Sequence, residues 1–123
     1  MMGRLLFRLA RSSLAAFLVG WSFAYFSFAL PVKRLKETDT LIAFHHPQPS
    51  HPLHILLVPK RARRNLPALS PSDADFSADL WAVVAELVAE LNLEAGGYRL
   101  VANGGAYQDV PQLHFHLISD DFR

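Results

Sequence analysis

Histidine is the residue type in this 123-residue sequence with the clearest potential for chemistry, and its six copies stand in three pairs: His45 and His46, His51 and His54, and His114 and His116. The last pair belongs to a segment, residues 112–118, in which apolar and polar side chains alternate. This alternation predicts a half-buried β-strand with Gln112, His114 and His116 on one face. Because a sheet can bring strand ends together around one pocket, we expect the three pairs to meet there.

Two chemistries suit such a cluster of imidazoles. Two histidines that alternate on a strand face the same way and can ligate a metal such as zinc. A neutral imidazole can instead attack phosphorus, while neighbouring histidines fix its tautomer and donate hydrogen bonds to phosphate oxygens. A solvated strand face that happens to carry histidine is the third interpretation. The sequence contains no cysteine, which excludes a thiolate metal site and a disulfide framework.

The elements that must position these histidines can be read from the remaining pattern. Strand-like segments occur at residues 32–36, 41–45, 54–58, 98–102 and 112–118. Ser70, Pro71 and Asp73 form the start signal of a helix whose apolar residues recur at helical spacing until Gly96 and Gly97 end it. This order of elements predicts an α+β domain with a mostly antiparallel sheet and one long helix across one face.

The N-terminal part of the chain has a different character. Residues 12–30 carry no charge and follow Arg4, Arg8 and Arg11, and a helix of that length spans roughly 28 Å of hydrocarbon. We therefore expect residues 1–30 to form a basic segment and a single transmembrane anchor helix, and residues 31–123 to form the soluble domain. A cleaved signal peptide is the competing interpretation, although no small-x-small cleavage site precedes Pro31.

Small residues recur along the expected anchor at Ala16, Gly20 and Ala24. Such a ridge allows another transmembrane helix to approach closely, although a lone anchor that faces lipid is an equal alternative. Basic residues flank the span on both sides, so charge does not decide its orientation. The formal net charge of +1 gives no reason to expect nucleic acid as a partner.

The sequence also resembles a known family, the histidine triad (HIT) nucleotide-binding proteins, and in particular their Hint-like branch. The resemblance covers about residues 30–118 and rests on five blocks in the family's order: Leu30-Pro-Val-Lys-Arg-Leu, Glu37-Thr-Asp-Thr-Leu-Ile-Ala-Phe-His45, His54-Ile-Leu-Leu-Val-Pro-Lys60, Gly97-Tyr-Arg-Leu-Val-Ala-Asn-Gly104 and Gln112-Leu-His-Phe-His-Leu-Ile118. It implies a HIT-like five-stranded sheet with one long helix, here preceded by the transmembrane helix.

The resemblance also implies a pocket for a nucleoside monophosphate or phosphoramidate. His114 would attack the α-phosphorus to form a nucleotidyl-histidine that water hydrolyses, His116 would contact phosphate, and His45 would orient the surroundings of the nucleophile. The nucleotide would be bound by His54, Asn103, Gln108, Gln112, Asp39 as a ribose contact, and Phe44 and Ile42 on the base side. No metal or other cofactor is required by this chemistry.

Three positions depart from the family's pattern. Gln112 replaces the first histidine of the triad, and His46 replaces a common aspartate. Asp109 stands where many relatives have a serine or threonine that donates to phosphate, and its carboxylate would repel a bound anion.

Two functions of different class therefore stay open. One is a membrane-anchored nucleotide hydrolase or phosphoramidase, and the other is a catalytically weak or inactive domain that serves as an accessory subunit of a larger membrane protein complex. The expected partners are the nucleotide, the lipid bilayer and other transmembrane helices. Because nucleotides are supplied in the cytoplasm, we expect the soluble domain on that side.

Overall fold

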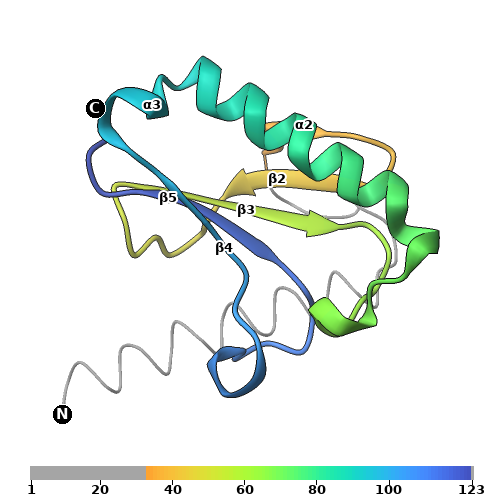
Figure 1. The fold of residues 1–123 in the computed structure, drawn as a ribbon. Coiled ribbons are helices and arrows are strands. Elements are labelled where there is room, and N and C mark those ends of the chain that lie inside the picture. Colours follow the sequence, from red (N-terminus) through yellow and green to blue (C-terminus); the bar gives the residue numbers. More distant parts are fainter. Residues whose placement is uncertain (1–32, 123) are drawn as a thin grey trace, which may run out of the picture.

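The computed structural model describes residues 33–122, which form a five-stranded sheet with a long helix across one face (Figure 1). The strands are β1 (Lys36–Glu37), β2 (Leu41–His45), β3 (Leu53–Pro59), β4 (Arg99–Val101) and β5 (Phe115–Ser119), in the spatial order β1-β2-β3-β5-β4. Every neighbouring pair is antiparallel. The expected α+β fold, with a five-stranded antiparallel sheet and one long helix, is confirmed.

The expected transmembrane helix and its ridge of Ala16, Gly20 and Ala24 lie outside the described residues. Within residues 33–122, no helix has the length and apolar character needed to cross a bilayer.

The long helix begins where the sequence predicts and is interrupted near its end. Ser70 and Asp73 form a reciprocal capping box around a short 3₁₀ turn, η3 (Pro71–Asp73), which leads into α2 (Ala74–Glu90). The sequence predicts a continuous helix up to Gly96, but the chain leaves it at Asn92, whose φ of 54° is left-handed, and forms a separate turn, α3 (Leu93–Gly96). Asparagine adopts this conformation more readily than most residues, which explains why the break falls there.

The core lies between α2 and one face of the sheet. Alternate residues of the three central strands point toward the helix, and the helix presents its apolar stripe to them. The buried cluster consists of Leu41, Ala43, Leu53, Ile55, Leu57, Phe76, Leu80, Val83, Val84, Leu87, Val88, Leu93, Leu113, Phe115 and Leu117. Residues of the opposite alternation, including the histidines of β3 and β5, are therefore left for the other face of the sheet.

Two strands begin three or four residues later than the sequence predicts. The first strand-like segment, residues 32–36, pairs as a strand at Lys36–Glu37, and the last, residues 112–118, becomes strand at Phe115. The second difference has a physical cause. In the register of β3 with β5, Leu113 would lie opposite Pro59, which has no N–H to donate to a ladder. Instead, the backbone N–H of Leu113 donates to the carbonyl of Arg63 at 2.7 Å.

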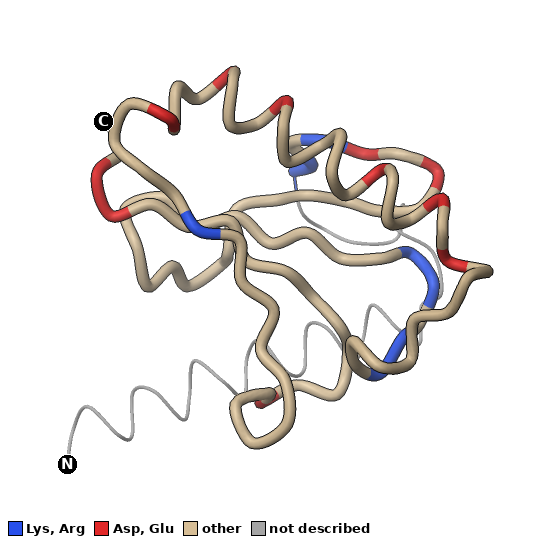
Figure 2. Tube along the Cα trace, in the orientation of Figure 1, with Lys and Arg blue, Asp and Glu red and all other residues tan. Residues whose placement is uncertain are grey.

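Charged side chains tie the turn after β3 to the start of the helix. Figure 2 shows that lysine and arginine gather in this turn, whereas aspartate and glutamate follow the helix. The guanidinium of Arg63 holds the buried carboxylate of Asp73, with Nη2 to Oδ1 at 3.0 Å and Nε to Oδ2 at 3.1 Å. The same turn carries the carbonyl that binds Leu113, so the helix start, the turn and the chain that precedes β5 form one connected unit.

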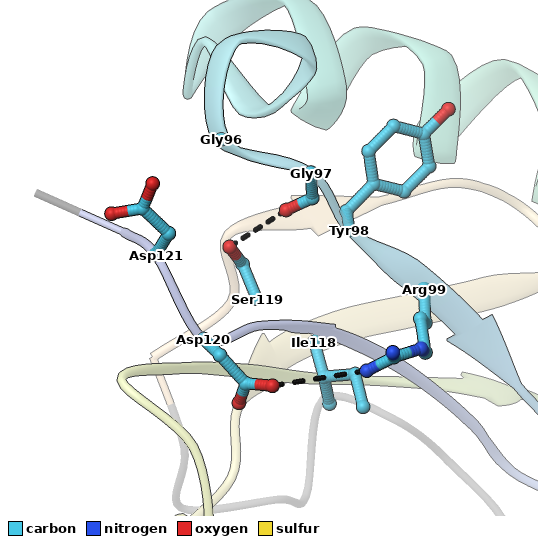
Figure 3. A pocket seen from close by; sticks show the side chains of 8 residues that line it. All are labelled: Gly96, Gly97, Tyr98, Arg99, Ile118, Ser119, Asp120 and Asp121. Atoms are coloured by element: carbon cyan, nitrogen blue, oxygen red, sulfur yellow. Dashed lines mark hydrogen bonds and ion pairs between the residues drawn. The ribbon is translucent and has the colours of Figure 1, made fainter.

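At the opposite end of β5, a cavity of about 270 Å³ opens beside the β4 edge (Figure 3). Ser119 Oγ donates to the carbonyl of Gly97 at 2.8 Å and so closes the β4–β5 end of the sheet. Asp120 lies 3.7 Å from Arg99 and 2.7 Å from Nδ1 of His51, and its carboxylate thus joins the ends of three chain segments.

Candidate functional site

Four imidazoles contact one another in succession on the sheet face opposite α2. Their ring centroids are 4.9 Å apart for His114 and His116, 5.1 Å for His116 and His54, and 4.4 Å for His54 and His46. We call these four residues the imidazole row. The pairing of β3 with β5 sets Leu56 opposite His116 and His54 opposite Ile118, which brings the two histidines diagonally together. His46 reaches the row because its backbone N–H donates to the carbonyl of His54 at 2.8 Å.

The tautomer of His114 is fixed by a backbone carbonyl. Its Nδ1 lies 2.7 Å from the carbonyl oxygen of Gln112, which can accept but not donate, so Nδ1 carries the proton. Burial lowers the pKa of His114, against smaller opposing effects of the Gln112 carbonyl and the Asp109 carboxylate. The ring is therefore neutral near pH 7, and its Nε2 has a free lone pair. A buried neutral imidazole of this tautomer is a nucleophile.

The tautomers of His54 and His116 follow from a second backbone group. The N–H of Ser50 donates to Nδ1 of His54 at 3.1 Å, so the proton of neutral His54 sits on Nε2. That nitrogen lies 2.8 Å from Nδ1 of His116, which must accept, and His116 therefore carries its own proton on Nε2. Burial, with a smaller contribution from neighbouring imidazoles, lowers the pKa of His54 to about 4 and that of His116 to about 3. Both rings are neutral near pH 7.

The chain of donors ends at an atom for which the described part of the chain supplies no acceptor. Nε2 of His116 is buried and has no hydrogen-bond partner among residues 33–122. A buried N–H that finds no acceptor costs on the order of 1–3 kcal/mol, which makes it a natural place for an acceptor that a ligand supplies. The next ring in the row is that of His114. A donor for an anion and a nucleophilic nitrogen thus lie side by side.

A family model of the HIT domain matches residues 28–123 of the sequence, most of its length. The chain belongs to the HIT family. Among curated proteins, it is 34% identical to a HIT-like protein of Azospirillum brasilense over 73% of this chain and 76% of that protein. It is 29% identical to a HIT-like protein of Helicobacter pylori over 75% of this chain and 88% of that protein.

Solved structures agree with this assignment. A histidine triad protein from Clostridium difficile superposes with a TM-score of 0.70 at 26% identity, over 82% of this chain and 88% of that one. A histidine triad nucleotide-binding protein from Candida albicans gives 0.64 at 28% identity, over 85% and 71% of the two chains. A HIT family hydrolase from Legionella pneumophila gives 0.66 at 27% identity, over 72% and 81%.

One histidine of this HIT domain lies away from the position predicted for it. His45 is exposed, and the alternation along β2 places it on the same side as Leu41 and Ala43, which face the helix. The next residue, His46, joins the imidazole row instead. The signal was present in the sequence, because the period of two that puts Ile42 and Phe44 on one face puts His46 there too.

The other predicted site residues differ in how far they are buried. Ile42 and Phe44 share the sheet face of the imidazole row and are fully buried, whereas Asp39 and Asn103 are exposed. Gln108 donates its side-chain amide to the carbonyls of Arg64, at 2.7 Å, and Val110, at 2.9 Å, and so braces the loop that leads to the nucleophile.

Gln112, which stands in place of the first triad histidine, is buried, and its side-chain amide donates to the carbonyl of Leu113 at 3.3 Å. Its backbone carbonyl orients His114, so this position contributes to the site through the main chain as well as through its side chain.

The zinc interpretation finds no support in residues 33–122. No group of three or more histidine, aspartate or glutamate side chains there is arranged to hold a metal ion. Within the imidazole row, the facing nitrogens of His54 and His116 are already joined to each other by a hydrogen bond.

Proposed function

We propose that this HIT domain binds a nucleoside monophosphate group and hydrolyses nucleotide phosphoramidates through a nucleotidyl-histidine at His114, as in the Hint-like branch of the family. The observation that carries the proposal is the juxtaposition of a buried nucleophilic ring, His114, with a buried unpartnered N–H on the neighbouring His116. The relatives described as a nucleotide-binding protein and as a hydrolase support the same chemistry.

The first step forms the covalent intermediate. The lone pair on Nε2 of His114 attacks the α-phosphorus, the phosphorus–nitrogen bond to the leaving amine breaks, and the amine takes up a proton from solvent. The attached imidazole becomes positively charged while its Nδ1–H stays in place. The carbonyl of Gln112, 2.7 Å from Nδ1, stabilises that charge and holds the ring toward the substrate.

His116 acts on the phosphoryl oxygens in both steps. Its Nε2–H is fixed in direction by the hydrogen bond from His54 at Nδ1, so the donor needs little reorganisation when negative charge develops. In the second step, water attacks phosphorus, the phosphorus–Nε2 bond breaks, and a water proton passes to solvent. The nucleoside monophosphate leaves and His114 returns to its neutral state.

Activity on a phosphoramidate provides the direct test. The purified full-length protein is expected to release AMP from an adenosine 5′-phosphoramidate, and His114→Ala is expected to reduce kcat by at least about a thousandfold, as loss of a nucleophile does in other enzymes. His51→Ala is the matched control, because this histidine pairs with Asp120 outside the imidazole row. A His114→Ala protein that retains wild-type activity would refute the mechanism.

The same proposal includes a membrane tether formed by residues 12–30, with the HIT domain on the cytoplasmic side. It is supported by the uncharged run in the sequence. The full chain is then expected to stay in the membrane fraction after alkaline carbonate washing, and release into the supernatant would rule out the tether. An Asp121→Cys protein that a membrane-impermeant reagent labels on intact cells would contradict the cytoplasmic side.

If the ridge of Ala16, Gly20 and Ala24 packs on other transmembrane helices, purification in mild detergent should retain partner proteins. A chain that always migrates alone in mild detergent would exclude a role as an accessory subunit.

A further inference from the structure

Two short 3₁₀ turns of the HIT domain consist of apolar residues and yet bury none of them. They are η2 (Leu66–Ala68) and η4 (Gly105–Tyr107). Leu66 is 50% exposed and Tyr107 is 81% exposed. Single apolar side chains on a surface are ordinary, but a group of them marks a contact site. The arrangement of the two turns therefore decides whether they have a role.

A hydrogen bond joins the two turns. The side-chain amide of Gln108, which follows η4, donates to the carbonyl of Arg64, which precedes η2, at 2.7 Å. Each turn is also closed by its own backbone, with the N–H of Leu69 bound to the carbonyl of Leu66 and the N–H of Gln108 bound to that of Gly105. In Figure 1, both turns lie toward the lower edge of the view and α2 runs along the upper edge. We call residues 66–68 and 105–107 the turn patch.

Basic side chains stand beside the turn patch. Arg61 and Arg64 are exposed, and neither makes an ion pair within residues 33–122. The neighbouring Lys60 and Arg63 are each paired with a carboxylate. Asp109, directly after η4, offsets part of the positive charge. The patch thus combines exposed apolar side chains with a net positive charge.

Acidic side chains are concentrated elsewhere on the domain. Residues 70–98, which include α2 and α3, contain aspartate and glutamate but no lysine or arginine. Figure 2 shows this separation, with acidic residues along the helix and basic residues in the turn after β3. A domain with such a charge distribution turns its basic side toward an anionic surface. An anionic lipid surface fits best, because its interfacial layer also accepts tyrosine and leucine side chains.

The start of the described chain lies beside the same basic turn. The carboxylate of Glu37 binds Nε of Arg34 through Oε1 at 3.0 Å and Nζ of Lys60 through Oε2 at 2.8 Å. Lys60 immediately precedes Arg61. A tether that ends at residue 30, as proposed above, would therefore hold the basic turn close to the bilayer.

We propose that the turn patch docks this HIT domain on an anionic lipid surface. Leu66 and Tyr107 enter the interfacial layer, and Arg61 and Arg64 pair with the phosphates of the headgroups. Each arginine near such a surface favours the docked state by about fivefold, so the pair contributes about 25-fold. The docking is a contact of the domain itself, in addition to the proposed tether, and it requires no catalysis.

The absence of cysteine from the sequence allows a test with single fluorescent labels. Ala68→Cys and Ala106→Cys place a label in each turn and leave Leu66 and Tyr107 intact, and Ala82→Cys, at an exposed position of α2, is the matched control. The full-length proteins are reconstituted into vesicles of phosphatidylcholine and phosphatidylglycerol that contain lipids with a quenching nitroxide on the headgroup. Strong quenching is expected at residues 68 and 106, and weak quenching at residue 82.

Charge reversal tests the role of the arginines. In Arg61→Glu/Arg64→Glu, the ratio of docked to free domain is expected to fall by at least about 25-fold, which brings the quenching at residues 68 and 106 to the level of residue 82. Vesicles without phosphatidylglycerol, or high salt with the unreversed protein, should also reduce the quenching, because both weaken the attraction between the charges. Leu66→Ser/Tyr107→Ser tests the apolar contribution and should reduce the quenching in the original vesicles.

Equal quenching at residues 68, 106 and 82 overturns the inference, and so does quenching that persists after charge reversal and in high salt. Labels in the turns that are shielded from iodide in water but are not quenched by lipid would indicate a second copy or another protein there, which also excludes lipid docking. Failure of the proposed function gives different results, namely release from carbonate-washed membranes for the tether and no AMP release for the catalysis.

Discussion

At the scale of single residues, three peptide groups determine the protonation pattern of the whole imidazole row. The N–H groups of Gln48 and Ser50 and the carbonyl of Gln112 each bind one ring nitrogen, and the fourth ring, that of His116, takes its tautomer from His54. The loop between β2 and β3 supplies two of the three. The shape of this loop therefore helps to decide which ring nitrogens face a substrate.

The depressed histidine pKa values predict a loss of stability in mild acid. The folded-state values of about 4 for His54 and about 3 for His116 lie below the unfolded value of about 6.5, so at intermediate pH the unfolded chain binds protons that the folded chain excludes. Stability should be complete above about pH 6.5 and fall toward pH 4. We expect Tm of the full chain to drop by at least about 5 °C over this range.

Two paired carboxylates lose their contribution below this window. Hydrogen bonds from Arg63 and His51 hold the pKa values of Asp73 and Asp120, respectively, below the ordinary value of an aspartate, so those carboxylates lose their contribution only in stronger acid. A His116→Leu protein should show a flatter Tm profile between pH 6.5 and 4. A Tm of the wild-type protein that is constant or rises over this interval would show that the row is not neutral when folded.

Asp109 provides a second prediction at this scale. Its carboxylate acts on the pKa of His114, which places it within electrostatic range of the nucleophile, and it is exposed. Repulsion of a bound phosphate by an exposed charge is on the order of 1 kcal/mol. Asp109→Asn and Asp109→Ser are therefore both expected to lower the Kd for AMP by about fivefold, as measured by calorimetry. If neither substitution changes the Kd, the carboxylate does not face the bound phosphate.

At the scale of elements, the chain just after β5 lies very close to the end of α3. A Cβ built on Gly96, at the end of α3, would lie 2.5 Å from the backbone oxygen of Asp121, beside the cavity of Figure 3. A backbone oxygen cannot move aside as the end of a flexible side chain can. This approach helps to fix the end of β5 against α3, and with it the Asp120 carboxylate that reaches His51.

Gly96→Ala is therefore expected to lower the free energy of unfolding by about 1–3 kcal/mol, the usual cost of overpacking. The matched control is Gly104→Ala, because a Cβ at Gly104 meets nothing within 4 Å and its φ of −134° suits any residue. Urea denaturation of both proteins measures the difference. Equal stabilities of the two variants would mean that the approach at Gly96 is looser than the structure shows.

At the scale of the whole molecule, the sequence predicts the fold better than it predicts the details of the site. The helix stripe and the strand alternation are local patterns, and the segments they indicate are those that build the sheet and α2. The late start of β5 was not predictable in this way. It depends on the register that sets Pro59 opposite Leu113 and on a hydrogen bond between Leu113 and Arg63, fifty residues apart in the chain.

The site shows the same division between local and distant information. The shared face of His114 and His116 follows from alternation alone. The donor chain from Ser50 through His54 to His116 requires a backbone group of one loop to meet rings from two strands, which no pattern of residue types specifies. His46 is a different case, because the alternation along β2 is sufficient to place it on the face of the imidazole row and to place His45 on the opposite face.

The most direct test of the central claim is a search for the covalent intermediate. The full-length protein is mixed with an adenosine 5′-phosphoramidate, quenched in base to preserve a phosphorus–nitrogen bond, and mapped by peptide mass spectrometry. We predict one adenylyl group on His114, absent from His114→Ala. An adenylyl group on a different residue, or turnover without any protein adduct in rapid-quench samples, would contradict the assignment of His114 as the nucleophile.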